Sequence, residues 1–411
     1  MNSVLEEDRE AVELPEMNSR FAIRTVRILM MCLLVVLGGK AGAVDDPLGG
    51  WRGGANVHPV TSHTDRHVIH AYFNACPESP DGKYVLYYTS TTVEGEEGDL
   101  RVLERATGQE RVIAQGIHAE DAHRAACQQW CNDGHTVAYH DCRDGRWFVV
   151  AIDVASGKET VLAEDHQIGF GSASQAWMPI YGCHWKPGPY RDLELVHVVT
   201  GEKRTVVTAA KVAEEYASFM QTKLGGTDIS VFFPVMSPDG KKVFFKPNLP
   251  TNRDDYRGMD SSKRDGKIIV DLETGRLLRL VNSWGHPSWT PDSRGILEKG
   301  NGILNVETGA EAPRFAPSCF SDHPSLSDDG TLFVTDADVS KRPYGKPGMW
   351  GIAVGPTTGD DYAVIYLFDN AHGATSWRHN HPHPHFSADG QRIYFNVNQG
   401  KWTQLFVAEK E

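Results

Sequence analysis

The stretch PVMSPDGKKVFFKP (residues 234–247) is an apolar strand, a tight turn of the type S-P-D-G, and a second apolar strand. Proline, aspartate and glycine each favour such a turn for a separate backbone reason. The same pattern recurs along the chain at 77–89, 128–141, 286–299, 323–336 and 383–396, and more weakly at 182–195. A unit repeated at a regular spacing indicates a repeat architecture, so this unit decides the fold.

A companion unit follows most copies. It reads ERATGQERVIA, DVASGKETVLA, HVVTGEKRTVV, DLETGRLLRLV and NVETGAEAPRF, each a turn between two short strands. Each repeat thus has four antiparallel strands, and the spacing of about 50 residues is typical of propeller blades. The last copy ends in WTQLFVAEKE without its fourth strand, so we expect residues near 55–70 to supply it. The sequence predicts an all-β, single-domain, seven-bladed β-propeller over residues 44–411.

Residues 1–43 differ from the repeats and have the pattern of a signal peptide. The basic MNSRFAIRTVR precedes the apolar ILMMCLLVVLGG, and AGA stands directly before Val44; this order predicts cleavage after Ala43. The apolar run is short for a bilayer span. We expect an exported protein, periplasmic or extracellular, with no stable membrane insertion after cleavage. A retained membrane anchor is the alternative.

The charge balance bears on the class of partner. The chain has 41 Lys and Arg residues against 54 Asp and Glu residues, whereas nucleic-acid binding needs a basic footprint. Nucleic acid is therefore not expected as a partner, and an anionic sugar would need a local cationic pocket. Six of the seven cysteines lie beyond the leader. Disulfides are an option in an exported protein, but the cysteine spacing gives no connectivity and is not a zinc-ribbon pattern.

One position recurs in the strand that should line the central channel of each blade. It lies seven residues before the last turn residue, and it is occupied in chain order by Ala75, Cys127, Tyr181, Phe233, His286, His323 and His383. Three consecutive blades therefore place a histidine at the same structural position. The pseudo-symmetry of a propeller directs all three toward one axis.

The last copy is preceded by WRHNHPHPHF, with histidines at every second position from 379 to 385. Alternate residues of a strand face one way, and prolines between them are tolerated on an edge strand. Two of these histidines and one from the neighbouring blade make a three-imidazole site. We take His323, His381 and His383 as candidate ligands of a divalent metal, and His379 and His385 as weaker candidates. Polar channel residues bonded to water are the alternative.

Charged loops are expected at the same mouth of the channel, at 139–147, 247–266 and 336–350. The segment HAEDAHRAACQQW (118–130) leads onto this face and brings His123, while His140 lies across the hairpin. Aromatic residues join them, namely Tyr181, Trp130, Trp284 and Trp377. A concave polar site with aromatic walls suits a sugar, although each aromatic residue alone is more often a packing residue.

Three motifs, SWGHPSWTPDS, SDHPSLSDDGTLF and HNHPHPHFSADG, occur in this order and resemble the oligogalacturonate lyases, seven-bladed propellers that bind Mn²⁺. HAYFNACPESPDG is similar to the first blade of that family. The resemblance implies that His286 is the catalytic base, facing the metal across the cavity, and that His323, His381 and His383 hold the metal. It implies Mn²⁺, with Zn²⁺ or Ca²⁺ as alternatives.

The chain departs from that family in the fourth ligand. The family has a glutamine where this chain has Arg378, so either His379 or water takes its place or the site is altered. The family arginine beside the substrate carboxylate falls around Arg264 to Lys267; Arg264 is the candidate, with Arg378 and Arg257 as alternatives. The ulvan lyases share the propeller and use a histidine and a tyrosine; AHRAACQQW with Tyr181 or Tyr190 is similar in kind. We therefore expect His123, His140, Tyr181 and Arg378 to contact substrate.

The expected function is a lyase that cleaves an anionic uronate oligosaccharide or polysaccharide by metal-assisted β-elimination. A base removes the proton beside the carboxylate, and the developing charge must be stabilised. The alternatives are an ulvan-lyase-like enzyme with a His/Tyr pair and a non-enzymatic exported binding propeller. The ring of histidines favours an enzyme. A serine hydrolase is not expected, because the sequence has no G-x-S-x-G elbow, and no carboxylate pair suggests a glycoside hydrolase.

Overall fold

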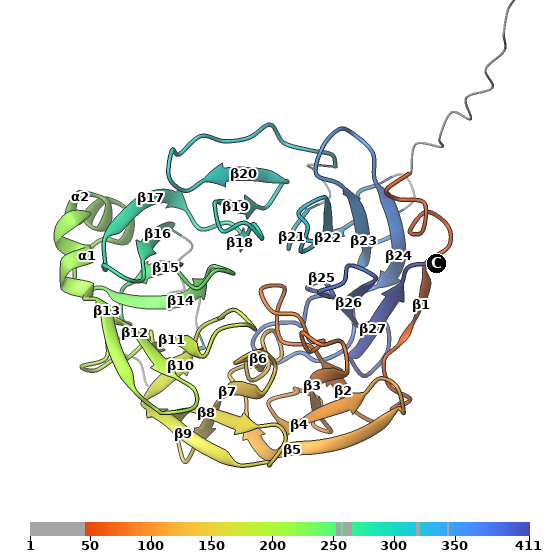
Figure 1. Cartoon of the computed structure of the whole chain (residues 1–411), viewed down its shortest axis with the longest axis horizontal. Helices are drawn as coiled ribbons and strands as arrows, with labels where there is room; N and C mark the ends of the chain where they lie inside the picture. The colour runs from red at the N-terminus through yellow and green to blue at the C-terminus, as the bar shows by residue number, and fades with distance from the viewer. Residues whose placement is uncertain (1–45, 252–255, 258–264, 318–320, 343–344) are drawn as a thin grey trace, which may run out of the picture. The chain divides into compact units, whose positions relative to one another are not determined.

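The computed structural model describes residues 46–251, 256–257, 265–317, 321–342 and 345–411. The candidate signal peptide (1–43) and Arg264 lie outside the described residues. Seven antiparallel sheets surround a central axis as the blades of a propeller (Figure 1). This arrangement confirms the fold predicted from the turn repeat.

The first three blades have four strands each. Their strands are β2 (His67–Ile69), β3 (Tyr84–Ser90), β4 (Glu97–Glu104) and β5 (Gln109–His118); β6 (Gln129–Cys131), β7 (Thr136–Arg143), β8 (Arg146–Asp153) and β9 (Glu159–Glu164); and β10 (His166–Ile168), β11 (Trp177–Gly182), β12 (Leu193–His197) and β13 (Lys203–Val207). Two short helices, α1 (Ala209–Glu215) and α2 (Ala217–Phe219), and a π-helical turn, η1 (Met220–Leu224), lead to the fourth blade. No helix of the described residues is long and apolar enough to cross a membrane.

The remaining blades continue round the axis. Their strands are β14 (Ser230–Met236), β15 (Lys242–Asn248), β16 (Asp265–Asp271) and β17 (Leu277–Ser283); β18 (Ser288–Trp289), β19 (Gly295–Glu298) and β20 (Gly302–Asn305); β21 (Ser325–Leu326), β22 (Leu332–Asp338), β23 (Met349–Pro356) and β24 (Ala363–Asp369); and β25 (His385–Phe386), β26 (Arg392–Val397), β27 (Gln404–Glu409) and β1 (Asn56–Pro59). Blade five is a three-stranded sheet within the described residues.

The ring is closed by β1, which joins the last blade. It pairs antiparallel with β27, with Asn56 opposite Glu409 and Pro59 opposite Phe406. The early strand therefore completes the sheet that the C-terminal strands leave unfinished, as expected for residues near 55–70. The pairing covers the outer edge of β27 and makes β1 the outermost strand of blade seven.

The repeated turn is held by the same side-chain contacts in several blades. Ser237 Oγ donates a hydrogen bond to Asp239 Oδ1 (2.6 Å) and accepts one from the backbone N–H of Lys242 (2.9 Å). Gly240 has φ +68°, which favours glycine. The hydroxyl-to-aspartate bond recurs in four other copies, in the pairs Ser79–Asp81, Thr290–Asp292, Ser327–Asp329 and Ser387–Asp389.

Blade three corrects one part of the sequence interpretation. Its inner strand is β10, and the turn that follows is closed by the backbone N–H of Gln175 donating to Ser172 O (3.0 Å). The weak copy at 182–195 instead contains the loop between the second and third strands, so Tyr181 lies on the second strand and not at the channel position. The true turn, GSASQA, has none of the Pro-Asp-Gly residues that marked the other copies.

The apolar faces of the blades pack against one another to form the core. Buried side chains of blade four, such as Phe244 and Ile268, belong to a cluster that extends into blades two, three and five. The five cysteines that the structure describes are free thiols, namely Cys76, Cys127, Cys131, Cys142 and Cys183. Packing between blades therefore holds the described part of the propeller together.

Candidate metal centre and active site

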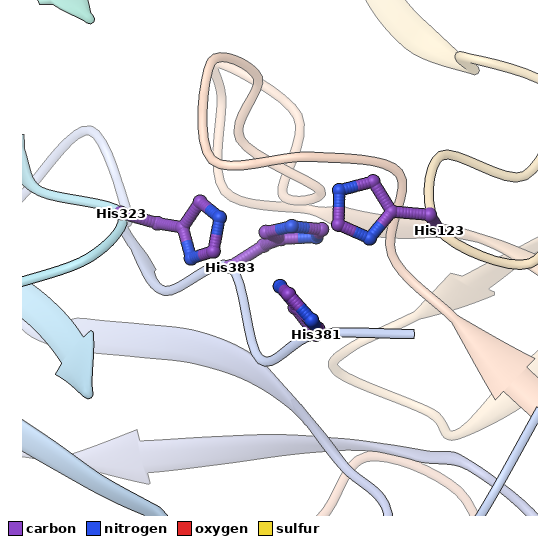
Figure 2. Close-up of side chains that lie close together, drawn as sticks. All are labelled: His123, His323, His381 and His383. Atoms are coloured by element: carbon purple, nitrogen blue, oxygen red, sulfur yellow. The ribbon is translucent and has the colours of Figure 1, made fainter. Parts of the chain in front are cut away.

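Four histidines gather at the inner edge of the blades (Figure 2). Each of His123, His323, His381 and His383 offers a ring nitrogen, and these nitrogens all lie within 4.8 Å of one another. His323 precedes β21, His381 and His383 precede β25, and His123 lies in the connection between β5 and β6. The structure thus brings together the three predicted ligands and adds His123, which the sequence placed on the substrate side.

The backbone before β25 is not the extended strand that the alternation of histidines predicted. His383 has φ +50°, and only His385 and Phe386 form the strand. The side chains of the two weaker candidates contact the backbone. His379 Nε2 lies 2.5 Å from the carbonyl oxygen of His372, and His385 Nδ1 lies 2.7 Å from that of Phe386. His379 therefore does not take the fourth place in the cluster.

The left-handed backbone at His383 recurs at equivalent channel positions. Cys127 in blade two has φ +51° and Phe233 in blade four has φ +56°. Such values are uncommon for residues with a Cβ atom and are found where the surrounding structure enforces them. The three residues had been aligned from the sequence alone, by their distance from the turn, and the shared conformation supports that alignment.

Hydrogen-bond partners of the ring nitrogen Nδ1 orient two of the four rings. His323 Nδ1 lies 2.9 Å and 3.0 Å from the two carboxylate oxygens of Asp336, on β22, and His123 Nδ1 lies 3.0 Å from the carbonyl oxygen of His379. The backbone N–H groups of His323 and His383 also donate to Asp336, at 3.0 Å and 3.2 Å. A proton placed on Nδ1 by such contacts leaves Nε2 as the nitrogen that can bind a metal.

Burial favours the neutral form of three of these imidazoles. It lowers the pKa of His381 to about 3 and the pKa of His123 and His383 well below the usual value. Burial also raises the pKa of Asp336 to about 7. Neutral imidazoles are the form that metal binding requires, so the four residues fit a divalent cation.

His286 lies beside this cluster, just before β18. Its Nδ1 is 2.9 Å from both the carbonyl oxygen and the carboxylate Oδ1 of Asp322, and Lys299 also contacts that carboxylate. Its ring stacks on His323, with ring centroids 4.4 Å apart. The sequence interpretation had placed His286 across a cavity from the metal ligands, and this expectation is wrong. The inner edges of blades five and six adjoin, so matched positions are brought into contact.

His140 and Tyr181 lie in a second buried group around Arg124. His140, on β7, is fully buried, and neither ring nitrogen has a hydrogen-bond partner among the described residues. Burial, aided by the charge of Arg124, lowers its pKa. Burial raises the pKa of Tyr181, on β11. The guanidinium of Arg124 contacts Glu120 and lies 5.0 Å over the ring of Phe233. The sequence places Arg124 beside His123 at the channel mouth, but the sequence reasoning missed its partner Glu120, although HAEDAHR contains both.

The other predicted cations are in ion pairs. Arg378 Nε donates to Asp121 Oδ2 (2.7 Å), and its guanidinium lies 4.4 Å over the ring of Trp377. Lys267 contacts the carboxylate of Glu298 and donates to the carbonyl oxygen of Trp284 (3.1 Å). Arg378 thus stays near His123, two residues from Asp121, whereas Lys267 is held in a buried contact between blades four and five.

Aromatic rings from three loops and from β8 form a continuous group. Tyr256 lies 6.0 Å from Trp147, 5.0 Å from Trp185 and 6.2 Å from Trp377, measured between ring centroids. Of the aromatics expected at the mouth, Trp377 belongs to this group. Trp130 is a buried packing residue that donates to Pro77 O (2.8 Å).

A cavity of about 410 Å³ is lined by residues from all seven blades, at the turn ends of the inner strands. Its lining includes Phe73, Trp130, Trp289 and Phe386. The four clustered histidines are not among its lining residues. The candidate metal centre is therefore distinct from this cavity.

No family model and no curated protein matches the sequence. The structure is similar to that of an oligogalacturonate lyase in complex with manganese, with a TM-score of 0.61 and 17% identity, over 87% of this chain and 94% of that one. It is also similar to an oligogalacturonate lyase from Vibrio parahaemolyticus, with a TM-score of 0.58 and 16% identity, over the same shares of the two chains. The chain has the propeller fold of these lyases.

Proposed function

We propose that the protein is a lyase that cleaves uronate-containing polysaccharides or oligosaccharides by β-elimination. The expected substrates are similar to oligogalacturonate. The observation that carries the proposal is the placement of His286 against a cluster of four imidazoles, three of them buried and that of His381 half-buried, at the inner edge of the blades. The similar fold of the oligogalacturonate lyases supports it. We further propose that residues 1–43 direct export, which would give the enzyme access to extracellular or periplasmic glycans.

In this proposal His123, His323, His381 and His383 hold a divalent cation. Manganese is the ion in the similar lyase, and zinc is the alternative that nitrogen ligands favour. A cation there would supply positive charge that neutralises the uronate carboxylate and stabilises the charge that develops on it. The role of the protein is to present neutral rings in a fixed orientation, which Asp336 secures for His323.

His286 is the proposed general base. Its Nδ1 proton is donated to Asp322, so Nε2 is the basic nitrogen and takes the proton from C5 of the uronate. The electron pair of the C5–H bond forms the C4=C5 double bond, and the C4–O bond breaks. The leaving oxygen takes a proton from water or from a neighbouring acid. Removal of a general base typically lowers the rate by about 10²–10⁴.

A second arrangement, similar in kind to the ulvan lyases, has one specific observation in its favour. Tyr181 and His140 are both buried beside Arg124, and the nitrogens of His140 have no partner in the described part of the chain. The raised pKa of Tyr181 keeps its phenol protonated at neutral pH. In this arrangement Tyr181 would protonate the leaving oxygen and His140 would take the C5 proton.

The test is the ultraviolet absorbance of the unsaturated product on pectic, ulvan and glucuronan substrates. We expect product from at least one substrate, and His286→Ala should lower the rate by about 10²–10⁴ while the metal content is unchanged. His385→Ala is the matched control, because that ring contacts the Phe386 carbonyl instead of the cluster. Absence of product from the metal-loaded protein on every substrate would favour the binding propeller. Full activity of His286→Ala would move the base to His140 and Tyr181.

A further inference from the structure

We propose that His123 is a metal ligand and not a substrate-binding residue, and that it makes the centre a four-imidazole site that selects Zn²⁺ over Mn²⁺. The inference concerns coordination alone. It uses the metal cluster of the proposed function but does not require that the protein catalyses elimination.

The position of His123 within the cluster supports this role. Its ring centroid lies 4.7 Å from those of His381 and His383 and 6.4 Å from that of His323, each in an edge-on arrangement. Figure 2 shows the four rings gathered in one small region. His123 thus adds to the histidines of blades six and seven a ring from the connection between blades one and two.

The surroundings of His123 argue against a role in holding sugar. The residue is 6% exposed, and its Nδ1 contacts the carbonyl oxygen of His379. The ring of Tyr72 packs edge-on against it, with centroids 5.7 Å apart. The edge of the imidazole that carries Nε2 is the one left for the cluster. A buried ring held at Nδ1 by a backbone carbonyl is the usual arrangement of a metal-bound histidine.

The donor set indicates which metal the site selects. The ligand group consists of four ring nitrogens, drawn from the described residues. The carboxylate of Asp336 contacts Nδ1 of His323 instead, and that of Asp322 belongs to a separate group with His286 and His323. Arg378 stands where the resemblance implies a glutamine, and it is an ion-pair partner of Asp121; a guanidinium cannot bind a cation. Imidazole suits Zn²⁺, whereas Mn²⁺ and Ca²⁺ prefer oxygen ligands, and four protein nitrogens match tetrahedral zinc.

The test is X-ray absorption spectroscopy of the protein loaded with Zn²⁺, together with binding titrations for Zn²⁺ and Mn²⁺. We expect four imidazoles at about 2.0–2.1 Å from zinc, and tighter binding of Zn²⁺ than of Mn²⁺. His123→Ala should reduce the imidazole count to three and weaken zinc binding by at least about 10-fold, the lower end of what lost orienting contacts cost. His379→Ala is the matched control, since its ring is turned to the His372 carbonyl, and it should keep four imidazoles.

Three imidazoles with an oxygen ligand in the wild type would overturn the inference, and so would unchanged zinc affinity in His123→Ala. The wild-type spectrum decides the question even where His123→Ala does not fold, and His123→Asn is a second variant that keeps a polar side chain. An inactive protein with a four-imidazole zinc site would contradict the proposed function and leave this inference intact. A protein that is active as a lyase but has three imidazoles at the metal would support the proposed function and contradict this inference.

Discussion

The carboxylate of Asp336 contacts two of the candidate ligands, His323 and His383. It accepts from Nδ1 and the backbone N–H of His323 and from the backbone N–H of His383. These contacts fix the ring of one ligand and the main chain of another. Their role is therefore to set the positions of nitrogens that a metal needs before it binds.

Asp336→Asn should weaken metal binding without removing a ligand. The amide keeps one acceptor oxygen but cannot accept from all three donors as a carboxylate does, so we expect the affinity to fall about 10–100-fold. Isothermal titration with Zn²⁺ measures this. Asp338→Asn, on the same strand but exposed, is the control and should bind as the wild type does. Equal affinities in both variants would contradict an orienting role for Asp336.

The sequence predicted His323 and His383 as members of one cluster because both are counted from a local turn, and the turn is set by nearby residues. The sequence did not predict ligands whose positions depend on how the blades assemble around the channel. His123 lies before an inner strand but outside the counted position, so only the assembled ring brings it to the cluster. The strict alternation before β25 failed because His383 takes a left-handed conformation that no local motif announces.

At the scale of the strand and turn, the aspartates of the repeated turn stabilise several blades in the same way. Asp329 accepts from Ser327 Oγ (2.6 Å) and from the backbone N–H of Thr331 (2.9 Å). The bond from Ser327 lowers the pKa of Asp329. The pKa is also lowered for the corresponding aspartates in four other blades, Asp81, Asp239, Asp292 and Asp389.

These shifts predict a loss of stability in acid. A carboxyl group whose pKa is lower in the folded state stabilises the fold above its unfolded pKa of about 3.9. That contribution is lost as the pH falls through the lowered folded value. We expect the free energy of unfolding, measured with urea, to decrease between about pH 5 and pH 2. The decrease should be smaller for Asp329→Asn, which cannot titrate. An Asp329→Asn variant with the same pH dependence as the wild type would assign the loss to other carboxyl groups.

Most blades were predictable from these turns, because the residues that close the turn are adjacent in the sequence. Blade three was not, since its turn is closed by a backbone bond between Ser172 and Gln175 with no marker residues. The seven-fold repeat still gave the right blade count, because a copy was expected there. The assignment of Tyr181 to the wrong strand followed from that one turn.

At the scale of the whole molecule, the join between β1 and β27 holds the two ends of the propeller together. A chain that begins after Pro59 would leave β27 as an exposed edge with unpaired backbone groups. We expect it to have a lower thermal midpoint and to aggregate, as measured by calorimetry and size-exclusion chromatography. A chain that begins at Asp46 keeps β1 and is the control. Equal midpoints for the two chains would show that the ring is stable without its closing strand.

The left-handed backbone shared by Cys127, Phe233 and His383 has a consequence for protein engineering. The bend is present in three of the blades, with a thiol, a phenyl ring and an imidazole alike, and is absent at Ala75, His286 and His323. Two further blades thus already offer the main-chain geometry that presents His383. A histidine grafted at 127 or 233 would start from a backbone that needs no reshaping, so a new centre could be built at another point around the same axis while the rest of each blade keeps its sequence.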